Sequence, residues 1–210
     1  MSSTYLLSFI GASLLLPESI VVVEKYLQYR DWEKVRKIVL ADNLLQARTR
    51  RSAVRIYSEI SKRLRLLPDS HLEFLVAASL SEQKQLLWYA ICNCYAFVHD
   101  FAVEVLHEKF LRMDYQITRL DYEAFFHRKA EWHEELDAVT PSTRDKMRTI
   151  LFRTMREANL LSKDHVILPA MLSDRLVALL SREDPNSLRI FPARITVNVG
   201  STGSVGREGP

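Results

Sequence analysis

The sequence predicts an all-α protein, mainly a helical bundle, with helix-turn-helix-like or winged-helix-like units and at most a small β element near the C-terminus. Glycine is scarce: the 210 residues contain five, and four of these lie at or beyond position 200, which leaves Gly11. Tight hairpins and phosphate-binding loops depend on glycine, so the body has little room for either. Apolar residues instead recur at helical spacing.

Capping residues mark where most of the predicted helices begin. The N-terminal signals of a helix are a side-chain cap or a proline in the first turn, and they stand here at Pro17, Asp31, Ser79, Thr118 and Thr140. The helices that follow are expected at about 17–30, 32–41, 80–95, 119–130 and 142–159. Further helices are expected at about 50–67, 98–113 and 173–180. The helix at 80–95 is apolar nearly all round and should be central.

The C-terminal part breaks this helical pattern. The segment 165–172 (HVILPAML) indicates a short strand, and 188–197 (LRIFPARITV) indicates a further extended piece. Helices followed by extended segments are typical of a winged helix. We therefore expect four regions: a helix-turn-helix-like unit at 1–68, a helical scaffold at 69–130, a winged-helix-like unit at 131–197 and a disordered Gly/Ser-rich tail at 198–210.

Positive charge is concentrated in one stretch of the chain. Between Lys34 and Arg65 there are ten Lys or Arg and two acids, a balance of +8, whereas the whole chain is +3, so everything else sums to −5. Concentrated charge indicates a charged partner. On a helix from residue 50, Arg51, Arg55 and Lys62 share one stripe, while the apolar residues face another way. A short helix, a polar break at 42–49 and a longer basic helix outline a helix-turn-helix; a solvated helix face is the plainer alternative.

A second basic helix follows later in the chain. From Ser142 to Lys163 there are six basic residues and two acids, or +4. The residues that we expect to contact a polyanion in the two segments are Arg48, Arg50, Arg51, Arg55, Lys62 and Arg65, followed by Arg144, Lys146, Arg153 and Arg156. Arg51 and Arg55, early in the first basic helix, are those expected to approach base edges.

Five blocks of the sequence together resemble a known family. They are SFIGASLLLPESIVVVEKYL, DNLLQARTRRSAVRIYSEISKRL, EQKQLLWYAICNCYAFVHDFAVEVLHEKF, DYEAFFHRKAEWHEEL and LFRTMREANLL. In order along the chain, from about residue 8 to 192, they are similar to BrxA, an accessory protein of BREX bacteriophage-exclusion systems. The resemblance implies a compact helical protein that binds double-stranded DNA and is encoded beside a methyltransferase, an ATPase and a phosphatase-like protein. It marks no active site.

Signs of an enzyme are missing from the sequence. It has no Walker A, GxSxG or HExxH motif, and His127, Glu131 and His133 do not share one helix face. Asp100 and Glu104 are one helical turn apart, where a structural ion pair is expected. We therefore expect no catalytic residue, cofactor or metal site. Trp32, Trp88 and Trp132 each sit at an amphipathic position, which favours core anchors over stacking platforms for bases.

Two remaining features concern the compartment. Cys92 and Cys94 lie on different sides of a helix, where a disulfide has poor geometry, so reduced thiols in a cytoplasmic protein are expected. The apolar run 5–16 is too short to span a bilayer, and no basic region precedes it, so no membrane partner is expected.

The sequence thus leads to a non-enzymatic protein that binds double-stranded DNA within a phage-defence system. Two alternatives use the same basic helix: an adaptor that docks on an acidic partner subunit, and an RNA-binding helical protein.

Overall fold

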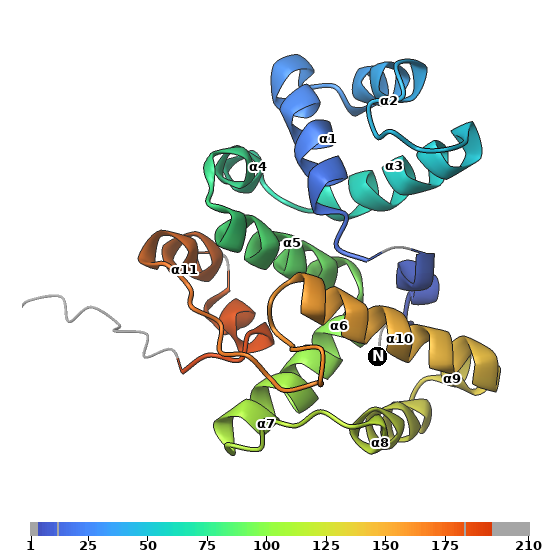
Figure 1. Ribbon diagram of the computed structural model, residues 1–210, viewed down its shortest axis with the longest axis vertical. Helices are drawn as coiled ribbons and strands as arrows, with labels where there is room; N and C mark the ends of the chain where they lie inside the picture. The colour runs from blue at the N-terminus through green and yellow to red at the C-terminus, as the bar shows by residue number, and fades with distance from the viewer. Residues whose placement is uncertain (1–3, 12, 183, 195–210) are drawn as a thin grey trace, which may run out of the picture.

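The computed structural model describes residues 4–11, 13–182 and 184–194, and it confirms the all-α class (Figure 1). The α-helices are α1 (Leu16–Tyr29), α2 (Trp32–Ala41), α3 (Arg50–Leu64), α4 (Asp69–Ala77), α5 (Leu80–Cys94), α6 (Ala96–Phe101), α7 (Glu108–Leu111), α8 (Arg119–Ala130), α9 (Glu134–Asp137), α10 (Pro141–Glu157) and α11 (Asp174–Ser181). Two 3-10 helices, η1 (Leu7–Gly11) and η3 (Pro185–Ile190), and a π-helical stretch, η2 (Ala102–His107), complete the elements.

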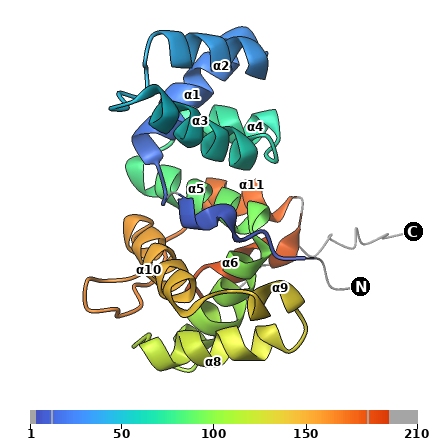
Figure 2. The ribbon, with the colours of Figure 1, turned by 90° about the vertical axis from the view of Figure 1, so that its right-hand side faces the viewer.

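Helices α1 to α4 form one layer at the N-terminal end of the molecule, seen at the top of Figures 1 and 2. Helix α1 packs against α2, α3 and α4, and α2 packs against α3. The predicted inward stripe of α3 is confirmed, because Tyr57, Ile60 and Leu64 are buried. Burial of these apolar faces is the main free-energy gain that holds short helices together.

Helix α5 lies between this layer and the rest of the chain (Figure 2). Its start is fixed by the expected capping box, in which Ser79 accepts from the Glu82 N–H and Glu82 accepts from the Ser79 N–H. Trp88 is fully buried, and its indole N–H donates to the Ile190 carbonyl at 3.0 Å. The prediction of a central helix and of a core role for Trp88 is therefore confirmed.

The helix expected at 98–113 is divided into three parts. It begins as α6, widens into the π-helical stretch η2 and ends as α7. Nothing in the apolar spacing indicates that π-helical stretch. Along the described part of the chain no single helix is long and apolar enough to cross a membrane; α5 and the α6–α7 stretch reach that length and composition only as a pair bent by 116°.

The C-terminal part contains less extended structure than the sequence predicts. Among the described residues the β content is two isolated bridges, Gln116–Val166 and Leu161–Ile167, so the strand expected at 165–172 does not form. The extended piece expected from Leu188 is wrong as far as Ile190, where the chain is 3-10 helix and buries both side chains in the core. The rest of that piece, from residue 195, and the tail at 198–210 lie outside the described residues.

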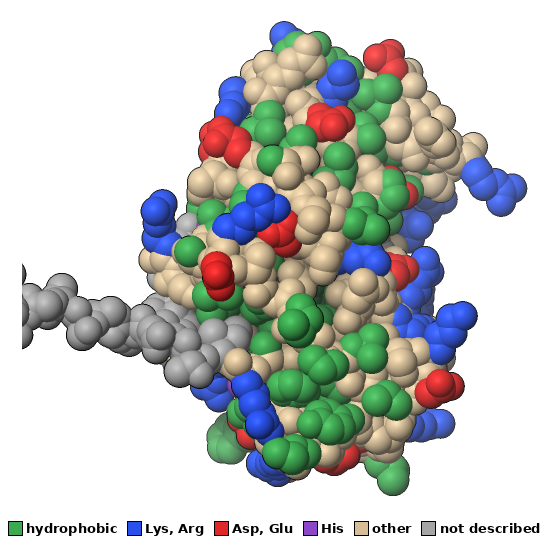
Figure 3. Space-filling model, turned by 60° about the vertical axis from the view of Figure 1, so that its left-hand side comes forward, with side chains coloured by type: hydrophobic (Ala, Val, Ile, Leu, Met, Phe, Trp, Pro, Cys, Tyr) green, Lys and Arg blue, Asp and Glu red, His purple; other side chains and the backbone are tan. Residues whose placement is uncertain are grey.

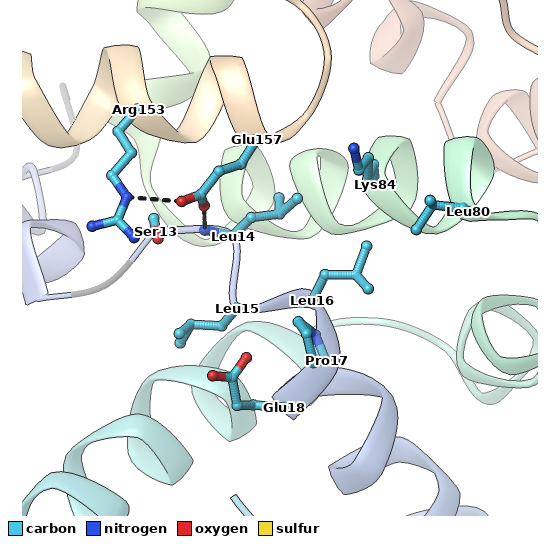
Figure 4. A pocket seen from close by; sticks show the side chains of 10 residues that line it. All are labelled: Ser13, Leu14, Leu15, Leu16, Pro17, Glu18, Leu80, Lys84, Arg153 and Glu157. Carbon is cyan, nitrogen blue, oxygen red and sulfur yellow. Dashed lines mark hydrogen bonds and ion pairs between the residues drawn. The ribbon is translucent and has the colours of Figure 1, made fainter. Parts of the chain in front are cut away.

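The N-terminal strap (residues 4–11 and 13–15) runs between α3 and α10. Its apolar side chains Tyr5, Phe9 and Leu14 are buried, which confirms a segment packed across the core. At its end the Leu14 N–H donates to the Glu157 carboxylate at 2.8 Å, and Glu157 also accepts from Arg153 (Figure 4). The strap thus ties the N-terminal layer to α10.

The three tryptophans have different surroundings. Besides the buried Trp88, Trp32 is half-buried and stacks on Tyr26 with ring centroids 4.2 Å apart. The core role expected for Trp132 is wrong, because this side chain is 77% exposed. The turn between α8 and α9 buries its neighbour His133 in its place. Both cysteines are free and buried, as expected, and burial raises the pKa of the Cys92 thiol.

Candidate nucleic-acid interface

Helices α2 and α3 and their connecting loop form a rigid unit. The Asp31 carboxylate accepts from two N–H groups of α2, at 2.8 and 3.1 Å, and so caps its N-terminus. In the loop, the Asn43 side chain donates to the Ala47 carbonyl and accepts from the Ala47 N–H. Thr49 then caps α3 by accepting from the Ser52 N–H. These local hydrogen bonds fix where α3 begins.

Three arginines project from the start of α3. Arg48, Arg50 and Arg51 are exposed, and along the described chain no ion pair or side-chain hydrogen bond joins them to another group. The first turn of α3 contains no acidic residue. The positive end of a helix macrodipole favours acids and disfavours arginines there, so this turn presents positive charge at a cost in helix stability.

The second half of the basic stripe on α3 is partly occupied by other groups. Arg55 donates to the Gly11 carbonyl of the strap at 3.1 Å, and Lys62 donates to the Ser8 hydroxyl at 2.7 Å. Arg65 lies 3.3 Å from Glu33 of α2 and over the Trp32 ring. The free charge on α3 is therefore greatest at its N-terminal end.

One basic residue of α3 serves the fold. Arg63 is only 4% exposed and donates to the Ser13 carbonyl at 2.6 Å, with Glu59 one turn away at 3.6 Å. It holds the strap against α3. Its burial agrees with its absence from the predicted contact residues, which lie on the other stripe of α3.

Two shallow hollows lie along the exposed side of α3. The larger, about 630 Å³, is lined by Arg51, Ser52, Val54, Arg55, Ser58 and Glu59. The smaller, about 370 Å³, is lined by Glu33, Arg36, Val54, Tyr57, Ser58, Ser61, Lys62 and Arg65. Small serine side chains between longer cations create these hollows, with Val54 contributing to both.

Helix α10 carries the second predicted set of cations, but acids and histidines already contact most of them. Arg144 lies 3.3 Å from Glu123 and 3.2 Å from the His127 ring. Arg153 donates to Glu157 at 2.8 Å, and Arg156 lies 3.4 Å from the His165 ring. Lys146 is exposed, and no ion pair among the described residues includes it.

Lysine and arginine are distributed unevenly over the surface. On the face shown in Figure 3, hydrophobic side chains gather in the lower half, and Lys and Arg stand mainly along the edges. That face presents no continuous basic patch, so the surface of the molecule is not uniformly basic.

The carboxylates considered for chemistry have structural partners. Lys129 donates to Asp100 at 2.6 Å and also contacts Glu104, which confirms the expected ion pair. Burial would raise the pKa of Asp100, but hydrogen bonds from His99 and Lys129 lower it well below its usual range. Glu82 has a lowered pKa because Arg175 and Ser173 donate to it. Within the described residues no group of three His, Cys, Asp or Glu is placed to hold a metal ion.

Comparison with known proteins places this fold in a family. The BrxA family model matches residues 3–184, which is nearly the whole chain. The chain belongs to the BrxA family. It is also 24% identical, over 133 residues, to "BREX protein BrxA" of Bacillus cereus (strain H3081.97). That match covers 63% of this chain and 66% of the relative, slightly under two thirds of the relative's length.

A solved structure shares the architecture of this BrxA-family chain. It is the crystal structure of an uncharacterized protein from Magnetospirillum magneticum, with a TM-score of 0.79 and 20% sequence identity. The likeness covers 90% of this chain and 100% of the other. At this identity it establishes the fold and nothing about activity.

Within this BrxA-family chain, α2 carries two cations outside the predicted set, and one of them lies beside it. Arg36 and Lys37 of α2 are exposed, and no ion pair of the described residues includes them. Arg36 lines the smaller hollow together with Lys62 and Arg65 of α3. Both residues lie in the basic stretch 34–65, but a stripe on α3 does not contain them. The packing of α2 against α3 places Arg36 beside that stripe.

Proposed function

We propose that this chain is a non-enzymatic component of a bacterial BREX phage-defence system that binds double-stranded DNA. Helices α2 and α3 act as a helix-turn-helix, with the N-terminal end of α3 at the DNA. The other proteins of such a system, among them a methyltransferase, an ATPase and a phosphatase-like protein, are its expected partners, and it acts in the cytoplasm. Membership of the BrxA family and the name of its Bacillus cereus relative support the defence role.

The observation that carries DNA binding is the charge at the start of α3. Arg48, Arg50 and Arg51 lack acidic partners among the described residues and stand at the positive end of the helix. A helix N-terminus with free arginines attracts phosphate through both its N–H groups and its charge. The arrangement lowers helix stability, and binding to a polyanion offsets that cost.

The remaining candidates extend this contact. Arg55, Lys62 and Arg65 continue along α3, and Arg144, Lys146, Arg153 and Arg156 form a second contact on α10. Because most of these are already bonded within the chain, we assign the larger share of binding to the end of α3. Arg51 lines the larger hollow, and we assign it the approach to a base edge. Phosphate contacts then dominate over base contacts, and sequence preference is weak.

The test is titration of a labelled duplex with the double variant Arg48→Glu, Arg50→Glu at about 50 mM and 200 mM salt. Each lost phosphate contact lowers the slope of log affinity against log salt by about 0.9. We expect the double variant to lose about tenfold or more in affinity and to show a shallower slope. Arg182→Glu, an exposed cation at the end of α11, is the matched control and keeps wild-type affinity.

Unchanged affinity in a correctly folded double variant contradicts the assignment to α3. A wild-type protein that leaves duplex DNA unbound at physiological salt favours an adaptor for an acidic subunit. Preference for a hairpin RNA competitor over the duplex favours an RNA-binding protein.

A further inference from the structure

One tryptophan projects from the turn between α8 and α9 on a rigid support. The Trp132 N–H donates to the Lys129 carbonyl at 3.1 Å, and the next residue, His133, is buried. The His133 ring stacks on Tyr5 of the strap with centroids 3.7 Å apart. Because the backbone on both sides is held, the 77% exposure of the indole is a property of the fold.

Acidic residues flank this indole along the chain. Glu131, Glu134 and Asp137 are exposed, and within the described residues no ion pair or side-chain hydrogen bond engages their carboxylates. Glu135 is different, because it accepts from the Tyr5 N–H and contacts His133. An exposed tryptophan is the side chain most typical of an interface hot spot. Its acidic border requires a basic counterpart.

The counterpart is present on the same chain. The larger hollow of α3 is lined by the cations Arg51 and Arg55 together with Ser52, Val54, Ser58 and Glu59, and at about 630 Å³ it is roomier than an indole ring. The Glu59 carboxylate already accepts from the Tyr95 hydroxyl and lies near Arg63, so the two arginines supply the free charge of the hollow. Arginine over an indole face adds a cation–π attraction to the burial of apolar area. The charge balance agrees, because the window containing α3 is +8 and the rest of the chain is −5.

We propose that these two surfaces join copies of this chain. Trp132 of one copy enters the larger hollow of a second copy, and the carboxylates of Glu131 and Glu134 pair with Arg51 and Arg55. The tryptophan with its acidic border and the basic hollow are complementary surfaces of one sequence. We therefore infer that the partner that fills the hollow is a second copy of this chain. Since Arg51 is also a proposed DNA contact, DNA and the second copy compete for it.

The test measures mass by sedimentation velocity and light scattering over about a hundredfold range of protein concentration. Wild type is expected to gain mass with concentration, and Trp132→Ala to remain monomeric. Leu120→Ala, which removes another exposed apolar side chain from α8, is the matched control and associates like wild type. Trp132 lies on the surface, and circular dichroism checks that each variant is folded.

A mixing experiment identifies the two halves of the contact. Trp132→Ala keeps an intact hollow, and the double variant Arg51→Glu, Arg55→Glu keeps an intact tryptophan. Neither associates alone, but an equimolar mixture forms a complex heavier than a monomer. Wild type that remains monomeric throughout, Trp132→Ala that associates like wild type, or a mixture that stays monomeric overturns the proposal.

DNA provides a further readout that keeps this inference separate from the proposed function. A short duplex added to the associated protein is expected to reduce the mass of the protein assembly, while Trp132→Ala binds the duplex as well as wild type. If the chain does not bind DNA, the mass and mixing results are unaffected. Failure of either proposal is therefore seen independently of the other.

Discussion

The two basic helices, α3 and α10, differ in how their charge is used. At the start of α3, Arg50 and Arg51 have no acidic partner among the described residues, whereas on α10 Arg144 and Arg153 are paired with Glu123 and Glu157. A pair with a carboxylate holds a guanidinium in place and reduces its attraction for phosphate. A count of basic residues therefore overstates the charge that α10 offers to a polyanion.

The largest expected difference between the helices is in DNA affinity. Arg50→Gln with Arg51→Gln removes two unpaired charges and should weaken duplex binding by about tenfold at moderate salt. Arg153→Gln with Arg156→Gln removes two charges already held by Glu157 and His165, and should weaken it by about threefold or less. Fluorescence anisotropy with one duplex measures both. Equal losses would mean that the ion pairs of α10 open on binding.

The next variant removes a carboxylate partner from arginines of α10, so that they resemble the unpaired arginines at the start of α3. Glu123 is largely buried and lies within 3.3 to 3.6 Å of Arg119, Arg144 and Arg148. Glu123→Gln leaves Arg144 without its carboxylate, while Arg119 and Arg148 keep Asp145 as a partner. The cost is therefore smaller than the roughly 3 kcal/mol for breaking a fully buried ion pair. We expect a lower free energy of unfolding in a urea titration together with duplex binding at least as tight as that of wild type. If Glu123→Gln is as stable as wild type, these ion pairs, which are longer than close hydrogen bonds, contribute little to the free energy of unfolding.

The fold could be predicted because capping residues act within a few positions of the helix that they begin. The site could be predicted only in part, because its charges are paired with residues from distant parts of the chain. The caps at Asp31, Ser79 and Thr118 act within four residues, so the sequence shows them directly. The carboxylate that holds Arg144 comes from α8, and no periodicity of α10 indicates it. The basic stripe of α3 placed Arg51, Arg55 and Arg65 on the exposed side of the helix, but it could not show that the strap covers part of that side and half-buries Lys62.

Trp132 shows the limit of amphipathic reasoning in a short segment. The spacing around it predicts burial, yet the turn after α8 directs His133 inward, where it stacks on Tyr5 from the far end of the chain. That choice depends on the path of the strap, which is fixed only when the whole chain is folded. The proposed division into regions at residues 68 and 130 likewise remains a prediction.

Acid should affect α10 more than the end of α3. Burial raises the pKa of Glu157, but hydrogen bonds from the Leu14 N–H and from Arg153 outweigh it, so the folded-state pKa is lowered. A lowered folded pKa stabilises the protein above the unfolded value, about 4.3, and that stability is lost as pH falls below it. Glu157→Gln should flatten the dependence of the melting temperature on pH below about 4.3, whereas Arg50→Gln should leave it unchanged. If the melting temperature of Glu157→Gln falls at low pH as that of wild type does, the effect belongs to the other carboxylates with a lowered pKa, which are Glu82, Asp100, Asp121 and Glu135.

The smallest expected effect tests an exposed pair on the α2–α3 unit. Glu33 and Arg65 are 3.3 Å apart with much of both side chains in solvent, where an ion pair contributes about 0–1 kcal/mol. Glu33→Gln should therefore leave the melting temperature within about 2 °C of wild type, because so small a free-energy change shifts it little. Removing a negative charge beside the smaller hollow should tighten duplex binding by about twofold, as expected for a gain of less than one phosphate contact. Glu33→Gln could instead destabilise the protein as much as Glu123→Gln does. Burial of the carboxylate would then not explain why the ion pairs of α10 are stronger than the exposed pair beside α3, and the proposed difference between the two helices would be wrong.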